Sequence, residues 1–222
     1  MNKLIDYFEQ YALASLEKQE KLSRLIHGHL CELDMDAWKI RFNSGLEFNF
    51  QVLGTESENT LTWLWAWADE QTEIPRNLIV SSLELKDWGE QHAVREFFIP
   101  GSDLDKAGGE MISLIASEVC GASCYYRDQY EGGSLFLLLF SEAIDKQPAF
   151  NPSGLLRRFQ ELAEKHDFNH KHALVSYLRM RNIPFIEKGR KIIAEFAPEE
   201  ELTIEFDDSE CITTSSSSSP AL

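Results

Sequence analysis

Three tryptophans occur at alternate positions in one short stretch of the chain, TWLWAWAD at residues 62–69. On an extended chain this spacing sends Trp63, Trp65 and Trp67 to one face of a sheet. Such a row of rings could stack against a planar or apolar ligand. The favoured alternative is that all three rings cover the core, because aromatic residues lie mostly in the interior.

Polar residues that could complete a ligand groove occur at the end of this stretch and further along the chain. Asp69 and Arg127 could supply polar contacts, and Tyr126 could form a wall. The candidate ligand-binding residues are therefore Trp63, Trp65, Trp67, Asp69, Tyr126 and Arg127. This groove requires Trp65 and Arg127 to lie on the same side of the sheet.

Histidines and cysteines occur in short patterns, but none of these patterns predicts a metal centre. His27, His29 and Cys31 alternate, as zinc ligation on an extended segment would need, yet no second cluster lies near them. Cys120 and Cys124 have three intervening residues, whereas the redox motif has two. We therefore expect no metal, no cofactor and reduced thiols.

Motifs of the familiar catalytic families are absent from the sequence. It contains no Walker loop, no Gly-x-Gly-x-x-Gly, no nucleophile elbow and no His-Glu-x-x-His. Because the chain has 37 acidic residues, neighbouring carboxylates such as Glu56 and Glu58 are expected by chance. No catalytic residue is predicted, and a non-enzymatic protein is favoured.

The composition indicates an acidic globular protein. The 222 residues carry a net charge of −16 and are 43% apolar, which allows a sizeable core and disfavours binding to nucleic acid or anionic lipid. No apolar run of about 18 residues predicts a membrane span, and the first residues lack the apolar stretch of a secretory signal. With only four cysteines, these features predict a cytoplasmic protein.

The elements that would position the tryptophans are a sheet and several helices. Period-two alternation at 38–43, 46–52 and 61–68 predicts an antiparallel meander whose third strand is the tryptophan stretch. Hairpins are predicted at 122–130 with 134–140 and at 191–196 with 202–206, and helices at 2–26, 75–88, 103–120, 152–166 and 170–181.

Single residues are expected to limit these helices. Gly89 would stop the second helix, and Asn169 would cap the last one. The pair Gly108-Gly109 either delays the start of its helix or lets another backbone approach closely. Residues 97–100 are predicted to be briefly extended.

These elements define an α+β fold class, in which an antiparallel meander and hairpins form a sheet covered by several helices. The serine-rich C-terminal tail is expected to be disordered. We expect an α+β domain with the tryptophan strand over 1–145, a helical pair with a β-hairpin over 146–208 and the disordered tail over 209–222. The second part could pack on the first as one domain.

Several of these stretches together resemble a bacterial family of uncharacterised proteins. The resemblance covers roughly residues 1–145 and rests on Gly54-Thr-Glu-Ser57, TWLWAWAD, the helix opened by Pro75, CYYRDQY and EGGSLFLLL. The usual family signature is Trp-Leu-Trp-Ala-Trp-Ala-Asn, so this chain has Asp69 where the family has asparagine. Because the family is a domain of unknown function, the resemblance implies one fold for the first two-thirds and no activity.

Charge is unevenly distributed toward the C-terminus. Residues 151–191 hold nine Lys or Arg against four acids, whereas 195–210 hold eight acids and no base. Solvated helix faces and a charged hairpin are the favoured interpretation. The alternative is an anion-binding or partner-binding face on the helices, and the acidic hairpin could also neutralise that face within the molecule.

The sequence leaves the function unknown but favours one class. The leading hypothesis is a cytoplasmic, non-enzymatic protein that binds a small molecule or another protein, through an exposed apolar patch or a pocket without convergent titratable groups. The alternative is an enzyme of unrecognised type with a cleft beside the tryptophan strand. A third possibility is an acidic decoy that occupies a basic partner. Neither nucleic acid nor a membrane is expected as a partner.

Overall fold

The computed structural model of the chain describes residues 3–28, 31–34, 36–70 and 74–218. The chain divides into two compact units, one of Met1–Leu4 with Lys18–Gln147 and one of Ile5–Glu17 with Pro148–Leu222. The long first helix, α1 (Lys3–Ile26), contributes to both. The predicted α+β class is confirmed, while the domain limit at residue 145 stays a prediction. No described helix is long and apolar enough to cross a membrane.

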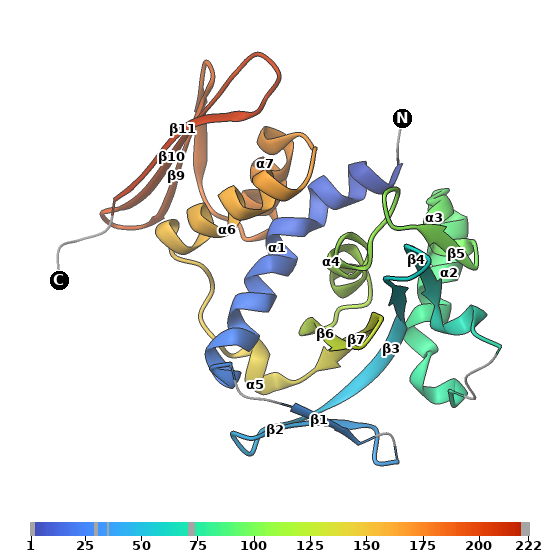
Figure 1. The fold of residues 1–222 in the computed structure, drawn as a ribbon. Helices are drawn as coiled ribbons and strands as arrows, with labels where there is room; N and C mark the ends of the chain where they lie inside the picture. Colours follow the sequence, from blue (N-terminus) through green and yellow to red (C-terminus); the bar gives the residue numbers. More distant parts are fainter. Residues whose placement is uncertain (1–2, 29–30, 35, 71–73, 219–222) are drawn as a thin grey trace. The chain divides into compact units, whose positions relative to one another are not determined.

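The first unit contains an antiparallel sheet of seven strands in the described part of the chain (Figure 1). The strands are β1 (Cys31–Asp34), β2 (Lys39–Phe42), β3 (Glu47–Ser57), β4 (Thr62–Trp65), β5 (Gly101–Asp103), β6 (Cys124–Tyr130) and β7 (Gly133–Phe140). The long β3 pairs with β2, β4 and β7. The predicted meander, β2–β3–β4, and the predicted hairpin, β6–β7, are therefore confirmed.

One face of this sheet buries a continuous apolar cluster. Its strand residues include Ile40, Phe42, Phe48, Phe50, Val52, Leu137 and Leu139. Leu22, from the second half of α1, packs into the same cluster. Each of these side chains stabilises the fold by about 1.5–3 kcal/mol when fully buried. A one-residue slip of a strand would expose its whole apolar set. The alternation that predicted the strands therefore also holds them in register.

The remaining helices of the first unit differ from the prediction at their ends. They are α2 (Val80–His92), α3 (Arg95–Phe98), α4 (Gly109–Val119) and α5 (Glu142–Asp145), with short 3-10 turns η1 (Ala66–Ala68) and η2 (Arg76–Leu78). The delayed helix start at Gly109 is confirmed. The prediction that residues 97–100 are extended is wrong for Phe97 and Phe98, which form the end of α3.

Gly89 does not stop α2 but lies inside it. A Cβ at this position would come within 2.5 Å of the Cβ of Phe97, so the glycine lets α3 approach α2 closely. The helix ends instead at His92, and Ala93, which follows it, has a left-handed backbone with φ of 58°. The glycine was therefore needed for packing, and the prediction of a stop signal was wrong.

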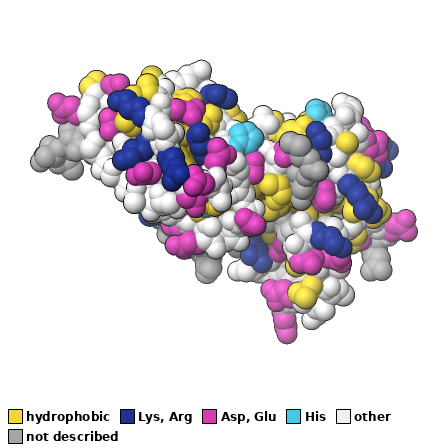
Figure 2. All heavy atoms as spheres, turned by 90° about the horizontal axis from the view of Figure 1, so that it is seen from above, with side chains coloured by type: hydrophobic (Ala, Val, Ile, Leu, Met, Phe, Trp, Pro, Cys, Tyr) yellow, Lys and Arg dark blue, Asp and Glu magenta, His cyan; other side chains and the backbone are white. Residues whose placement is uncertain are grey.

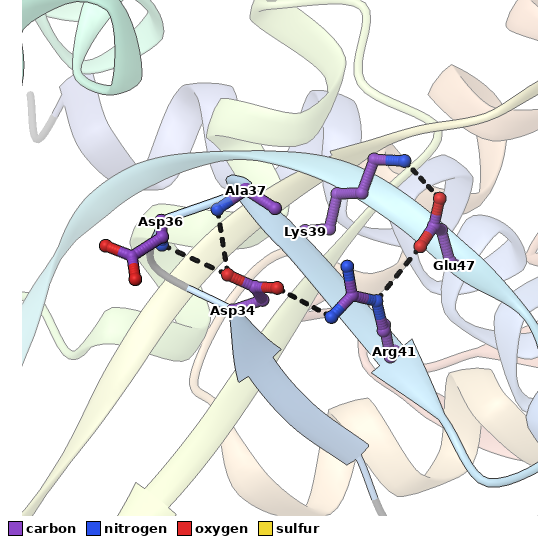
Figure 3. A network of polar contacts seen from close by, with 6 residues as sticks. All are labelled: Asp34, Asp36, Ala37, Lys39, Arg41 and Glu47. Atoms are coloured by element: carbon purple, nitrogen blue, oxygen red, sulfur yellow. Dashed lines mark hydrogen bonds and ion pairs between the residues drawn. The ribbon is translucent and has the colours of Figure 1, made fainter.

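An exposed polar network joins β1, β2 and β3 (Figure 3). Arg41 pairs with Asp34 at 2.6 Å and with Glu47 at 3.0 Å, and Lys39 also pairs with Glu47. The Ala37 N–H, more than Arg41, holds the pKa of Asp34 below its ordinary value. Because exposed ion pairs contribute little to stability, we expect this network to add little to the free energy of unfolding.

The second unit combines two helices with a separate four-stranded sheet, coloured orange to red in Figure 1. The elements are α6 (Pro152–Lys165), α7 (His170–Met180), β8 (Phe185–Lys188), β9 (Lys191–Ala197), β10 (Glu200–Phe206) and β11 (Ile212–Ser218), with the sheet in the order β11-β10-β9-β8. Asn169 caps α7 as predicted, since its Oδ1 accepts a hydrogen bond from the His172 N–H at 2.8 Å.

The serine run differs from the expectation of a disordered tail. Residues 212–218 form β11, which pairs antiparallel with β10 and lies beside α6, where Gln160 donates to the Ser215 hydroxyl at 3.1 Å. Serine has little strand preference of its own, so pairing with an existing strand must supply the order. Residues 219–222 lie outside the described residues.

The start of β11 is expected to depend on pH through His170. The ring Nδ1 of this histidine accepts a hydrogen bond from the Ile212 N–H at 3.1 Å, which requires that nitrogen to be unprotonated. Burial lowers the pKa of His170, although the carboxylates of Asp167 and Asp207 oppose the shift. A lowered folded pKa gives stability that is present above about 6.5 and is lost as the pH falls through the folded value.

We therefore expect amide hydrogen exchange in residues 212–218 to accelerate below pH 6.5, after correction for intrinsic rates. In the His170→Gln variant the ring that titrates is gone, so exchange should not respond to pH in this range. An equal acid response in both proteins would contradict the role of His170.

Candidate functional site

Trp63 and Trp65 lie side by side on the second face of the sheet and are at most 1% exposed. Their rings meet edge to face with centroids 5.3 Å apart. Phe136 packs on Trp63 at 5.4 Å and Phe97 packs on Trp65 at 5.5 Å. These two indoles are core residues, and a ligand could reach them only if neighbouring side chains moved.

Trp67 does not continue the row of indoles. β4 ends at Trp65, and Ala66 turns into the core as the first residue of η1. The expectation that all three tryptophans share one face is therefore wrong for Trp67, because the backbone leaves the extended conformation before it. Trp67 is half-buried, with the Lys86 ammonium 4.7 Å from its ring centroid, and Asp69 follows after η1.

Arg127 and Tyr126 lie on opposite faces of the sheet. The register Trp65↔Gly54↔Phe136↔Arg127 places Arg127 on the same face as Trp65. The guanidinium lies over the Phe136 ring at 5.6 Å, so Arg127 is separated from Trp65 by that ring. Tyr126 points the other way and packs on the apolar cluster. The structure thus brings Arg127 near the tryptophans and places Tyr126 apart from them.

A polar cluster forms at the N-terminus of α4. Glu56 Oε1 accepts a hydrogen bond from the Gly109 N–H at 2.5 Å, which satisfies a helix-end donor and complements the helix dipole. Arg127 donates through Nε to the Ser134 hydroxyl at 2.9 Å and through Nη2 to Glu56 at 3.4 Å. These groups satisfy one another, so Glu56 acts as a helix cap that reaches α4 from a neighbouring strand.

A pocket of about 290 Å³ opens at the outer edge of the tryptophan strand. It is lined by Arg95, Glu96, Ile99, Gly101, Ser102, Asp103 and Lys106, from α3, β5 and the turn that follows. The tryptophan strand, β4, contacts both walls of the pocket, β5 and α3. β5 pairs with β4 through Trp63↔Ser102, and the Trp65 indole N–H donates to the Glu96 carbonyl at 2.9 Å.

Two donors in this pocket have no partner among the described residues. The Ser102 hydroxyl is buried without a hydrogen bond, and the exposed Arg95 forms no ion pair within the described part of the chain. Lys106 differs, because it pairs with Asp103 at 2.5 Å and that hydrogen bond raises the pKa of Lys106. Arg95 and Ser102 therefore carry the unpartnered donors of the lining, of which the Arg95 side chain is exposed and the Ser102 hydroxyl is buried.

The cysteines and histidines form no comparable site. All four cysteines are free, burial raises the pKa of Cys120 to about 12, and burial also raises the pKa of Cys124. Both thiols are therefore protonated and poorly nucleophilic at neutral pH. The described residues contain no group of three or more ligands suited to a metal ion, and His29 lies outside them.

Sequence reasoning missed the pocket, and only a weak signal pointed to it. Arg95 and Lys106 are ordinary exposed cations, and no pattern in the sequence distinguishes Ser102. Gly101 is the weak signal, because a Cβ there would come within 2.6 Å of the Trp63 carbonyl oxygen. The glycine allows two backbones to approach closely, but the sequence around it does not show which backbone approaches.

The fold and pocket together define an α+β protein with a small polar site at the edge of an antiparallel sheet. Residues 5–142 match the model of a family described as a family of unknown function, DUF6882. Because this match covers more than half of the chain, the protein belongs to that family. No curated protein and no solved structure matches the chain. The matched segment contains the tryptophan strand and every lining residue of the pocket.

Proposed function

We propose that this protein is a non-enzymatic binding protein whose pocket between α3 and β5 takes a small molecule with a carboxylate or phosphate group. The observation that carries the proposal is the pair of unpartnered donors, the Arg95 guanidinium and the buried Ser102 hydroxyl, in one pocket. A guanidinium binds planar oxyanions through two parallel hydrogen bonds. Trp65 has a positioning role, because its indole holds the Glu96 carbonyl.

The lining residues favour binding over catalysis. They include no histidine or cysteine, and the pKa of Lys106 is raised by Asp103. General acid–base catalysis needs a group whose pKa lies near the working pH, and this shift moves Lys106 further from neutrality. An enzyme with its cleft beside the tryptophan strand is the rival proposal, and turnover of a retained molecule would favour it.

The proposal also places the protein in a bacterial cytoplasm. The four free cysteines support a reducing compartment. The net charge of −16 disfavours nucleic acid and anionic membranes as partners.

The test is native mass spectrometry of the protein from its own host, followed by thermal-shift titration with inorganic phosphate and succinate. We expect Arg95→Ala to weaken binding by roughly 10-fold to 100-fold, since a hydrogen bond to a charged group contributes about 1.5–3 kcal/mol. Arg76→Ala is the matched control, because Arg76 is also exposed and has no ion pair among the described residues. Equal titration curves for the two variants would refute the site.

Ser102→Ala separates a ligand-binding role from a structural one. Removing a buried hydroxyl that has no partner relieves a desolvation penalty, so we expect unchanged stability or a gain of up to about 1 kcal/mol. Anion affinity should nevertheless fall. Ser113→Ala is the control, because the Ser113 hydroxyl in α4 is also buried and unpartnered within the described residues. The control should show a similar stability change and unaltered binding.

A further inference from the structure

On the outer face of the C-terminal sheet, a row of two carboxylates lies next to a row of two apolar side chains. One row pairs Glu195 with Glu201, and the next pairs Ile186 with Ile193. The structure shows a shallow hollow of about 210 Å³ lined by Pro184, Phe185, Ile186, Ile193, Glu195 and Glu201. Ile186 is 51% exposed, which makes it one of the exposed large apolar side chains of the described chain. The hollow therefore has an apolar floor beside two carboxylates.

The charge of these two carboxylates is not neutralised within the described residues. Elsewhere in the unit, basic and acidic groups pair, as Lys171 does with Glu187 at 2.9 Å and Lys191 with Glu205 at 3.3 Å. Figure 2 likewise shows the two signs of charge intermixed over the face that it presents. Glu195 and Glu201 differ, because like charges directly opposite on a sheet destabilise it and neither forms an ion pair in the described chain.

The hollow lies against the free edge of β8. This strand is last in the order β11-β10-β9-β8, so in the described chain it pairs on one side only. The Glu195 N–H donates to the Pro184 carbonyl at 3.0 Å, and hydrogen-bonded pairs alternate along an antiparallel ladder. Residues 184 and 186 therefore direct their backbone groups toward β9, whereas Phe185 and Glu187 direct theirs toward the open edge.

We propose that this edge binds an extended segment of a partner protein that carries a lysine or arginine two residues from an apolar side chain. An added strand would hydrogen-bond to the backbone of Phe185 and Glu187. Side chains two apart on a strand lie on one face, about 6.6–6.8 Å apart, which matches the spacing of the Ile186–Ile193 and Glu195–Glu201 rows. Pro184 and Lys188 bound the edge and protect it from indiscriminate strand pairing.

The charge part of the proposal is tested with the fluorescein-labelled peptide Ser-Arg-Thr-Ile-Thr-Val and its Arg-to-Glu counterpart. Fluorescence anisotropy should show binding of the first peptide alone. We expect the double variant Glu195→Gln, Glu201→Gln to bind roughly tenfold more weakly. The control variant Glu164→Gln, Glu199→Gln removes two exposed acids of the same unit and should bind like the wild type. Equal affinity of the two double variants would overturn the proposal.

The strand-addition part is tested with Glu187→Pro against Glu187→Gln. Proline removes the N–H that faces the open edge, and proline is tolerated on edge strands, so the β8–β9 pairing should survive and peptide binding should be lost. Both variants lose the ion pair with Lys171, so they differ in the backbone of residue 187, where proline lacks the N–H and fixes φ. A wild-type dimer that Glu187→Pro dissociates would mean that a second copy occupies the edge, and the proposed partner would be wrong. These outcomes are independent of the pocket in the first unit.

Discussion

Replacing Arg181 with methionine is expected to lower the free energy of unfolding by about 3 kcal/mol or more. The Glu17 side chain is 2% exposed and lies 2.9 Å from the Arg181 Nε. The Tyr177 hydroxyl donates to the same carboxylate at 2.7 Å and the Phe150 N–H does so at 3.0 Å. Methionine keeps much of the packing volume but removes the Arg181 guanidinium from beside the buried carboxylate, and removing one partner of a buried ion pair is costly.

Urea denaturation followed by circular dichroism measures this loss. Arg179→Met is the matched control, because Arg179 lies in the last turn of α7, two residues before Arg181, is exposed and has no ion pair among the described residues. The double variant Glu17→Gln, Arg181→Met should recover part of the loss, since a neutral amide leaves no uncompensated charge. If Arg181→Met costs no more than Arg179→Met, the ion pair does not stabilise the unit.

The strands were predictable where burial follows a local period. Between residues 46 and 52 apolar and polar side chains alternate, and the apolar set packs into the core. The same alternation misled at Trp67, because Ala66 suits a strand or a turn equally well and the chain leaves the sheet there. The period of a sequence predicts which side chains are buried, but it does not predict where the backbone leaves the extended conformation.

The features that sequence could not predict depend on contacts between distant residues. β11 exists because β10 offers it a partner and His170 binds its first N–H, although its serines suggest disorder. The pocket beside the tryptophan strand likewise depends on the pairing of Ser102 with Trp63. Neither Arg95 nor Ser102 differs in local sequence from an ordinary surface residue, so the site appears only once β5 is placed against β4.

The tryptophan face itself depends on one glycine. Gly109, the first residue of α4, lies where an added Cβ would come within 2.6 Å of the Phe136 ring and 2.8 Å of the Trp63 ring. Both rings are buried and pack on one another, so neither can give way freely. We expect Gly109→Ala to cost about 1–3 kcal/mol through overpacking, which exceeds the gain of up to about 1 kcal/mol from replacing a helical glycine.

Thermal unfolding monitored by tryptophan fluorescence tests this expectation. Gly108→Ala is the control, because a Cβ at that position would meet its nearest neighbours at 3.6 Å, which is an ordinary contact. Leucine is smaller than phenylalanine and has no ring. The variant Phe136→Leu, combined with Gly109→Ala, should therefore restore part of the stability, because it leaves space for the new methyl group. A lack of any such rescue would show that the cost lies in the backbone at the start of α4, where Glu56 caps the Gly109 N–H, and that the aromatic packing is not its cause.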